Sequence, residues 1–175
     1  MSSLINDVRA SEEFKKFKKI IERAKSKADI DGGMAEALSL HTSRLSRGLR
    51  GKDRYSPHVL IDASLQDMSN RARLVELRVK NDVQLETVKE AIQAMARYIS
   101  TEYAEDLRDE FSTAAQRNAF SDRAMKNAKK YLADGQAFIA TLDTLIKDID
   151  QAGYNIKAAI ECLKLLEGSK AGRVV

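Results

Sequence analysis

Hydrophobic residues recur along this chain at spacings of three and four, the pattern of helices that bury one face. The longest run lies near the C-terminus, where every a and d position of six consecutive heptads is apolar or glycine. In chain order these positions hold Ala128, Tyr131, Gly135, Phe138, Leu142, Leu145, Ile149, Ala152, Ile156, Ala159, Leu163 and Leu166. Six uninterrupted heptads predict one long helix that packs against other helices, above all those of sister subunits.

A third apolar position in each heptad makes this stripe wider than a two-stranded coiled coil needs. It is the e position, which holds Leu132, Ile139, Ile146 and Ile160. The width favours a bundle, or a helix that packs on its own chain and on a neighbour. We expect the oligomer contacts at Phe138, Leu142, Leu145, Ile149, Ile156 and Leu163. Gly135 and Gly153 allow close helix approach or, alternatively, a kink.

Another long helix is predicted to begin at Ser56-Pro57, because serine caps helix N-termini and proline is tolerated in the first turn. Its apolar residues form two a/d ladders, the first made of Leu65, Met68, Ala72, Val75 and Val79, the second of Leu85, Val88, Ile92, Met95 and Ile99. Six residues separate the ladders where seven would keep phase, so we expect a local change of supercoil without a break. Crowded acidic residues predict an end between 103 and 119.

The N-terminal part of the chain predicts two shorter helices. Ser11 followed by Glu12 and Glu13 is typical of a helix start, and Gly32-Gly33 is the expected end of that helix. A second helix is expected to carry Met34, Ala37, Leu38 and Leu45, before a glycine-containing loop over residues 46–57.

These elements predict an all-α fold of long amphipathic helices that forms an oligomeric helical bundle or ring. We divide the chain into a basic N-terminal helical region with an Arg-rich loop (1–55), a long-helix hairpin that serves oligomerisation (56–168) and a disordered tail (169–175). One proline, eight glycines and no tryptophan in 175 residues agree with long helices.

The sequence lacks the residue patterns of a catalytic centre. His41 and His58 lie in unrelated contexts, and no metal-ligand spacing or nucleotide-binding glycine motif occurs. We therefore expect a non-enzyme without metal or cofactor. The only cysteine, Cys162, lies beside the heptad position Leu163, which predicts a packed and inert thiol. No signal-peptide pattern or run of 18 apolar residues occurs, so we expect a cytoplasmic protein without a membrane partner.

Charge is segregated along the chain, although the net charge is only +4. Residues 1–54 carry 13 Lys and Arg against 8 Asp and Glu, whereas residues 55–111 carry 7 against 11. A polyanion site explains such asymmetry, and a chance imbalance on solvated helices explains it equally well.

The densest basic cluster lies in the predicted loop and its flank, at Arg44, Arg47, Arg50, Lys52 and Arg54. Cations on the following helix extend it, at Arg71, Arg73, Arg78, Lys80, Lys89 and Arg97. Arginine forks bind phosphate, and few aromatics argue against extensive base stacking. We therefore predict sequence-independent contact with a nucleic-acid backbone through these residues. The alternatives are a solvated linker, and binding by the lysine ladder Lys15, Lys16, Lys18 and Lys19.

Residues 150–170, DQAGYNIKAAIECLKLLEGSK, resemble the C-terminus of UvsY-type phage recombination mediators. The matching residues are Gly153, Tyr154, Ile156, Lys157 and Ile160. The stretch KYLADGQAFIATLDTLIKDI is similar to the family segment that precedes it, and ARYISTEY at 96–103 to the segment near its DNA-binding region, where Arg97 is the one cation that transfers. The first 60 residues are longer and more basic than the family pattern.

The resemblance implies a ring-like helical oligomer encoded by a phage and working in the host cytoplasm. Such a protein would bind single-stranded DNA and help load a recombinase in place of the single-strand-binding protein. Two other classes stay open: a structural or adaptor protein of phage assembly that binds only protein, and a small packaging subunit that binds duplex DNA. Single-strand preference, subunit number and protein partners are left open at this point.

Overall fold

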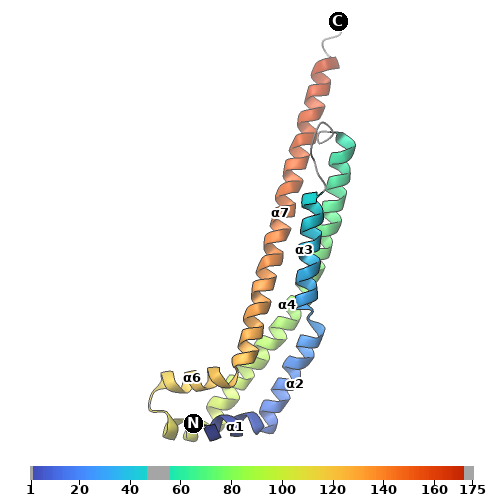
Figure 1. Ribbon diagram of the computed structural model, residues 1–175. Helices are drawn as coiled ribbons and strands as arrows, with labels where there is room; N and C mark the ends of the chain where they lie inside the picture. The colour runs from blue at the N-terminus through green and yellow to red at the C-terminus, as the bar shows by residue number, and fades with distance from the viewer. Residues whose placement is uncertain (1, 47–55, 172–175) are drawn as a thin grey trace. The chain divides into compact units, whose positions relative to one another are not determined.

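The computed structural model describes residues 2–46 and 56–171 (Figure 1). Within these ranges the chain is all-α, as predicted, and no strand occurs. The helices are α1 (Ser2–Ala10), α2 (Glu12–Lys27), α3 (Ile30–Ser46), α4 (Pro57–Glu102), α5 (Ala104–Glu110), α6 (Ala114–Ala124) and α7 (Lys126–Ala171). None of these helices contains a segment long and apolar enough to cross a bilayer.

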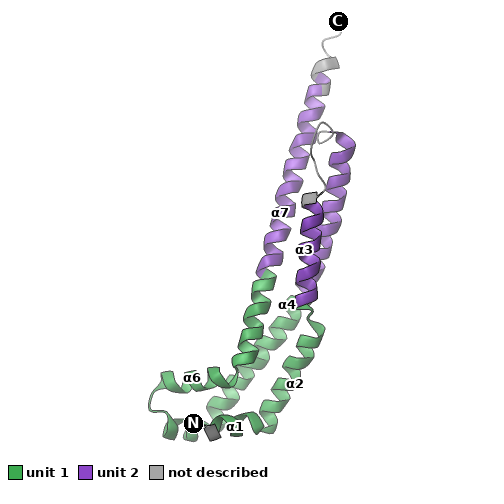
Figure 2. Cartoon of the chain, viewed as in Figure 1, with its two compact units in different colours: residues 1–30, 80–139 green, residues 31–79, 140–175 purple. Residues whose placement is uncertain are grey.

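The chain divides into two compact units, coloured separately in Figure 2. Unit 1 contains residues 1–30 and 80–139, and unit 2 contains residues 31–79 and 140–175. The two long helices, α4 and α7, each contribute one part to each unit. These boundaries differ from the predicted division at residues 55 and 168.

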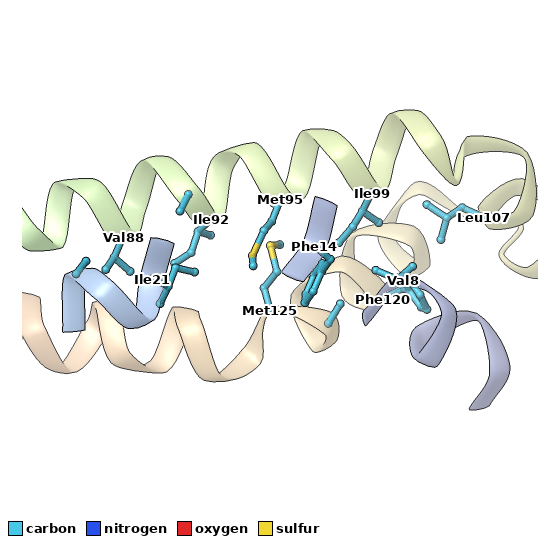
Figure 3. Close-up of a cluster of buried hydrophobic side chains, with 13 residues drawn as sticks. Val8, Phe14, Ile21, Val88, Ile92, Met95, Ile99, Leu107, Phe120 and Met125 are labelled. Carbon is cyan, nitrogen blue, oxygen red and sulfur yellow. The ribbon is translucent and has the colours of Figure 1, made fainter. Parts of the chain in front are cut away.

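Unit 1 is built around one apolar cluster, to which α1, α2, α4, α5, α6 and α7 all contribute (Figure 3). The second predicted ladder of α4, Leu85, Val88, Ile92, Met95 and Ile99, is between 0% and 7% exposed, and its last four residues belong to the cluster. That prediction is confirmed. Each such side chain contributes roughly 1.5–3 kcal/mol through burial.

Edge-to-face aromatic pairs extend the cluster. The ring centroids of Phe17 and Tyr98 lie 6.3 Å apart, and those of Tyr98 and Tyr103 lie 6.0 Å apart. The short helices α1, α5 and α6, which supply Val8, Leu107 and Phe120 to the cluster, were not predicted.

The helix starts follow the capping residues in the sequence. The Ser11 hydroxyl accepts a hydrogen bond from the Phe14 amide at 3.3 Å, so the predicted start of α2 is confirmed. The predicted start at Ser56-Pro57 is also confirmed, since α4 begins at Pro57. The predicted end at Gly32-Gly33 is wrong: α2 ends at Lys27, and both glycines lie inside α3.

The buried face of α4 in unit 2 differs from the predicted one. Leu60, Ala63, Leu74 and Leu77 are buried, together with the polar residues Asp67 and Asn70. The first predicted ladder points elsewhere, since Leu65, Met68 and Val79 are 60%, 65% and 52% exposed. We call Ile61, Leu65, Met68, Ala72, Val75 and Val79 the α4 stripe. The first predicted ladder is thus mostly exposed in a single chain, and its partner stays a prediction.

The helix α4 is nevertheless continuous over 46 residues, as predicted. The buried residues of unit 2 continue the spacing of the second ladder backwards through Asn81 to Leu60. Polar residues at 67, 70 and 81 interrupt this row and conceal it in the sequence. The apparent change of phase at Val79 is therefore a change from one helix face to another.

The helix α7 is also continuous over 46 residues, without the end or break that its glycines allow. A Cβ on Gly135 would overlap the side chain of Leu85, so Gly135 permits close approach of α4 and α7 in unit 1. Nothing lies near a Cβ placed on Gly153. The tail predicted to be disordered from residue 169 is helical through Ala171, and residues 172–175 lie outside the described residues.

Part of the heptad row of α7 is buried in a single chain. Phe138, Leu142, Leu145, Ile149 and Ile156 are between 0% and 8% exposed in a single chain. Leu163 packs against the cluster of Leu60, Ala63 and Ile156 in unit 2. These six residues were predicted to contact sister subunits; five of them are already buried in a single chain and Leu163 is partly buried. The thiol of Cys162 was predicted to be packed and is exposed instead.

Candidate nucleic-acid interface

Most of the predicted phosphate-binding arginines of unit 2 are held in ion pairs. The Arg44 Nε atom lies 2.9 Å from Asp67 Oδ1, and the two side chains are only 12% and 5% exposed. This pair joins α3 to α4. Because both partners are mostly withdrawn from solvent, Arg44 serves packing and has little surface to offer to a phosphate.

Two further arginines connect α4 to α7 within unit 2. The Nε atom of Arg71 lies 2.6 Å from Asp150 Oδ1, and that of Arg78 lies 2.6 Å from Asp143 Oδ1. The hydrogen bond from Arg71 to Asp150, and the negative charge of that carboxylate, raise the pKa of the guanidinium.

Arg73 joins α4 to α3 through Glu36 and also contacts Glu76 on its own helix at 2.7 Å. Hydrogen bonds to these two carboxylates raise the pKa of Arg73. In unit 1, Lys89 is paired with Glu86 at 2.9 Å. The positive charge of Arg73 is therefore largely balanced by two carboxylates of unit 2, whereas the exposed one-turn pair of Lys89 is weak.

Two of the predicted phosphate-contacting residues, Lys80 and Arg97, are exposed. Neither has an ion-pair partner among the described residues. Both belong to unit 1. The densest predicted cluster, Arg47, Arg50, Lys52 and Arg54, lies outside the described residues, so its role stays a prediction.

The helix α2 presents the largest group of unpaired cations in unit 1. Lys18, Lys19, Arg23 and Lys27 are exposed, and no carboxylate of the described residues lies within ion-pair distance of them. Lys15 and Lys16 form only exposed pairs one turn apart, with Glu12 and Glu13. Such pairs are weak and exchange readily. We call these six residues the α2 basic face.

The α2 basic face borders a cleft of about 450 Å³ that also involves α1, α4, α6 and α7 of unit 1. Arg9, Lys18 and Lys25 line it, together with the amide side chain of Asn127 and the carboxylate of Glu22, which lies 3.0 Å from Lys25 Nζ. Lys25 Nζ lies 5.0 Å from the centre of the Tyr131 ring, a cation–π contact that joins α2 to α7. Arg9 donates to the backbone carbonyl of Arg123 at 3.1 Å.

The first turns of α7 add exposed cations to unit 1, at Lys126 and Lys130. Lys126 directly precedes the cleft residue Asn127, and Lys130 precedes Tyr131. Unit 1 therefore combines the α2 basic face, the lined cleft and the start of α7. This arrangement suits a phosphate backbone, which binds through charge without a requirement for base contacts.

Unit 1 also has an acidic side, formed by α1 and α5. Asp7, Asp106, Asp109 and Glu110 line a separate cavity beside Tyr103. A polyanion would be repelled from these carboxylates. The described residues contain no group of three potential metal ligands.

Comparison with protein-family models, with curated proteins and with solved structures finds no match to this chain. The assignment of the interface therefore rests on the residues themselves. Sequence reasoning considered Lys15, Lys16, Lys18 and Lys19 only as an alternative, and it omitted Arg23, Lys27, Lys126 and Lys130. Their presence is visible in the sequence, but whether each cation has a carboxylate partner is a property of the fold.

Proposed function

We propose that the chain binds single-stranded nucleic acid without sequence preference, through the α2 basic face of unit 1. The observation that carries this proposal is the contrast in pairing. Lys18, Lys19, Arg23 and Lys27 have no carboxylate partner among the described residues, whereas Arg44, Arg71, Arg73 and Arg78 are all paired. Unpaired cations gain most from an anion.

The biological role that we propose is that of a recombination mediator. The resemblance of residues 150–170 to UvsY-type mediators supports it, as do the all-α fold and the basic surface. Such a protein would act as a homo-oligomer, bind single-stranded DNA, and contact a recombinase and a single-strand-binding protein. It would need no cofactor and no catalytic residue.

A second candidate is a helical adaptor that binds only protein. The exposed α4 stripe favours it, because a long apolar surface on a helix is typical of protein contacts. The adaptor hypothesis predicts no affinity for nucleic acid of either kind. A duplex-binding packaging subunit predicts instead a preference for double-stranded DNA.

The decisive experiment measures binding of labelled single-stranded and duplex DNA by fluorescence anisotropy at several salt concentrations. The test variant carries Lys18→Gln, Lys19→Gln and Arg23→Gln. Its matched control carries Lys147→Gln, Lys157→Gln and Lys164→Gln, three exposed cations of α7 in unit 2 that have no carboxylate partner in the described part of the chain. Both variants have the same net charge, so a difference between them reports location.

We expect the α2 variant to bind single-stranded DNA of every sequence more weakly. The slope of log K against log salt concentration should become shallower by about 2, since each phosphate contact contributes roughly 0.7. The α7 control should keep the wild-type slope. Equal loss in both variants would mean diffuse attraction by net charge, and an unchanged α2 variant would overturn the proposed site. In that case the predicted cluster at Arg47, Arg50, Lys52 and Arg54 becomes the next surface to neutralise.

A further inference from the structure

Among the described residues of unit 2, the α4 stripe gathers several exposed apolar side chains on one helix. Ile61, Leu65, Met68 and Val79 are 47%, 60%, 65% and 52% exposed. Together with Ala72 and Val75 they occupy consecutive d and a positions, at spacings of four and three residues. An unbroken a/d row of this length on a continuous helix is the surface that a coiled coil uses.

The remaining helices of unit 2 are already engaged on the other side of α4. The helix α3 contacts it through the Arg44–Asp67 pair. The helix α7 contacts it through the cluster of Leu60, Ala63 and Ile156. The described part of the chain thus packs on a row that includes Asp67 and Asn70, and it leaves the more apolar row of the same helix in solvent.

We propose that the α4 stripe is a self-association surface, on which a second copy of this chain lays its own α4 stripe, parallel and in register. The charges that flank the stripe favour an identical stripe as the partner and a parallel direction of the two helices. Arg71 occupies a g position and Glu76 the e position five residues later. In a parallel pair of helices these two positions face each other across the seam, so the two copies form two Arg71–Glu76 contacts.

The antiparallel arrangement is disfavoured by the same residues. With the apolar positions superposed, Arg71 would face Arg71 of the second copy, and Asp62 would face Glu76. Like charges beside a seam oppose association. A pairing of identical stripes is therefore complementary in charge only when the helices run in the same direction.

Both members of the proposed contact remain accessible in a single chain. The side chains of Arg71 and Glu76 are 46% and 65% exposed. Arg71 directs its Nε and Nη2 atoms to Asp150, and its remaining guanidinium donors are available to a second carboxylate. Glu76 accepts through one oxygen from Arg73. Contact with a second copy therefore needs no internal pair to break.

Sedimentation velocity over a range of protein concentrations tests the proposal without nucleic acid, so its result is independent of the proposed function. The variant Leu65→Glu, Met68→Glu places charge in the middle of the stripe. The control is Leu38→Glu, which charges an apolar side chain 51% exposed on α3 of the same unit. Circular dichroism confirms that each variant keeps its helices.

We expect the wild type to associate at micromolar concentration, the stripe variant to associate at least about 100-fold more weakly, and the control to match the wild type. A monomeric wild type would overturn the proposal. Association that is unchanged by the stripe variant would overturn it too, and would point to a different surface of the chain.

Disulfide trapping tests the direction. In a Cys162→Ala background, Met68→Cys places one thiol in the stripe, and a parallel pair in register brings the two thiols within the range that a disulfide requires. We expect rapid cross-linking of this variant under mild oxidation, and none for Leu38→Cys in the same background. Cross-linking that occurs only when a Met68→Cys chain is mixed with an Ala72→Cys chain would demonstrate the antiparallel pair and overturn the proposed arrangement.

Discussion

The two halves of α4 belong to one uninterrupted helix, yet they use their apolar residues differently. From Leu85 to Ile99, in unit 1, every residue of the predicted ladder is buried by the chain's own helices. From Leu65 to Val79, in unit 2, the predicted ladder is mostly exposed and a partly polar row is buried in its place. The same sequence pattern therefore has two outcomes on one helix.

The difference follows from what each unit offers as a partner. In unit 1, side chains from five other helices converge on α4, and together they supply enough apolar surface to cover its best face. In unit 2, α3 and α7 are the described partners, and among the α3 residues whose burial is described only the small residues Gly33 and Ala37 are buried. An apolar ladder thus predicts that a helix has a partner. It does not predict that the partner belongs to the same chain.

The largest effect that we expect from a single change is at Asp67, a buried carboxylate of α4 in unit 2. Replacing Asp67 by Ala leaves Arg44 mostly buried without its carboxylate, which should cost about 3–5 kcal/mol of unfolding free energy. Urea denaturation followed by circular dichroism measures this loss. The double variant Arg44→Met, Asp67→Leu should recover most of it, because an apolar pair of similar size avoids the burial of charge.

A pair of truncations compares the two halves of α4 directly. Ile99 is fully buried in unit 1, so Ile99→Ala should cost about 2–5 kcal/mol. Leu65 is 60% exposed in unit 2, so Leu65→Ala should change the stability of the single chain by less than about 0.5 kcal/mol. Urea denaturation at low protein concentration measures both. Equal losses would contradict the described burial of the two halves.

The two glycines of α7 make a similar comparison on the opposite helix. Gly135→Ala introduces a methyl group into the space of Leu85, and the required repacking should cost about 1–3 kcal/mol. Gly153→Ala meets no neighbour and should stabilise the helix by about 0.5–1 kcal/mol. Thermal unfolding of the two variants should therefore shift in opposite directions. A stabilising effect at both positions would mean that α4 and α7 are not in close contact at Gly135.

Much of the fold could be predicted from the sequence, because helix periodicity and capping are local properties. The start of α2 at Ser11, the start of α4 at Pro57 and the continuous heptads of α7 are examples. The short helices α5 and α6 were missed, although α6 begins with a capping box formed by Thr113 and Gln116. Their apolar residues are too few for a periodic signal.

The functional surface could be predicted only in part. The sequence prediction counted cations, and it included Arg71, Arg73 and Arg78 because the basic loop leads directly into the helix that carries them. Whether a cation is free depends on residues far away in the sequence, such as Asp150, which lies 79 positions from Arg71. Local density therefore identifies the basic regions of the chain, whereas the pairing of each cation with a distant carboxylate depends on the fold.

The smallest effect that we expect is the loss of a cation that is already paired. Arg78→Gln removes a positive charge from unit 2, but its partner Asp143 then becomes a free anion at the same place. Affinity for single-stranded DNA should change by less than about twofold at moderate salt, because no phosphate contact is lost. Lys19→Gln removes the same charge from the α2 basic face and should weaken binding more strongly. Anisotropy titrations compare the affinities of the two single variants for single-stranded DNA. A larger loss for Arg78→Gln would mean that the phosphate-contacting surface includes α4.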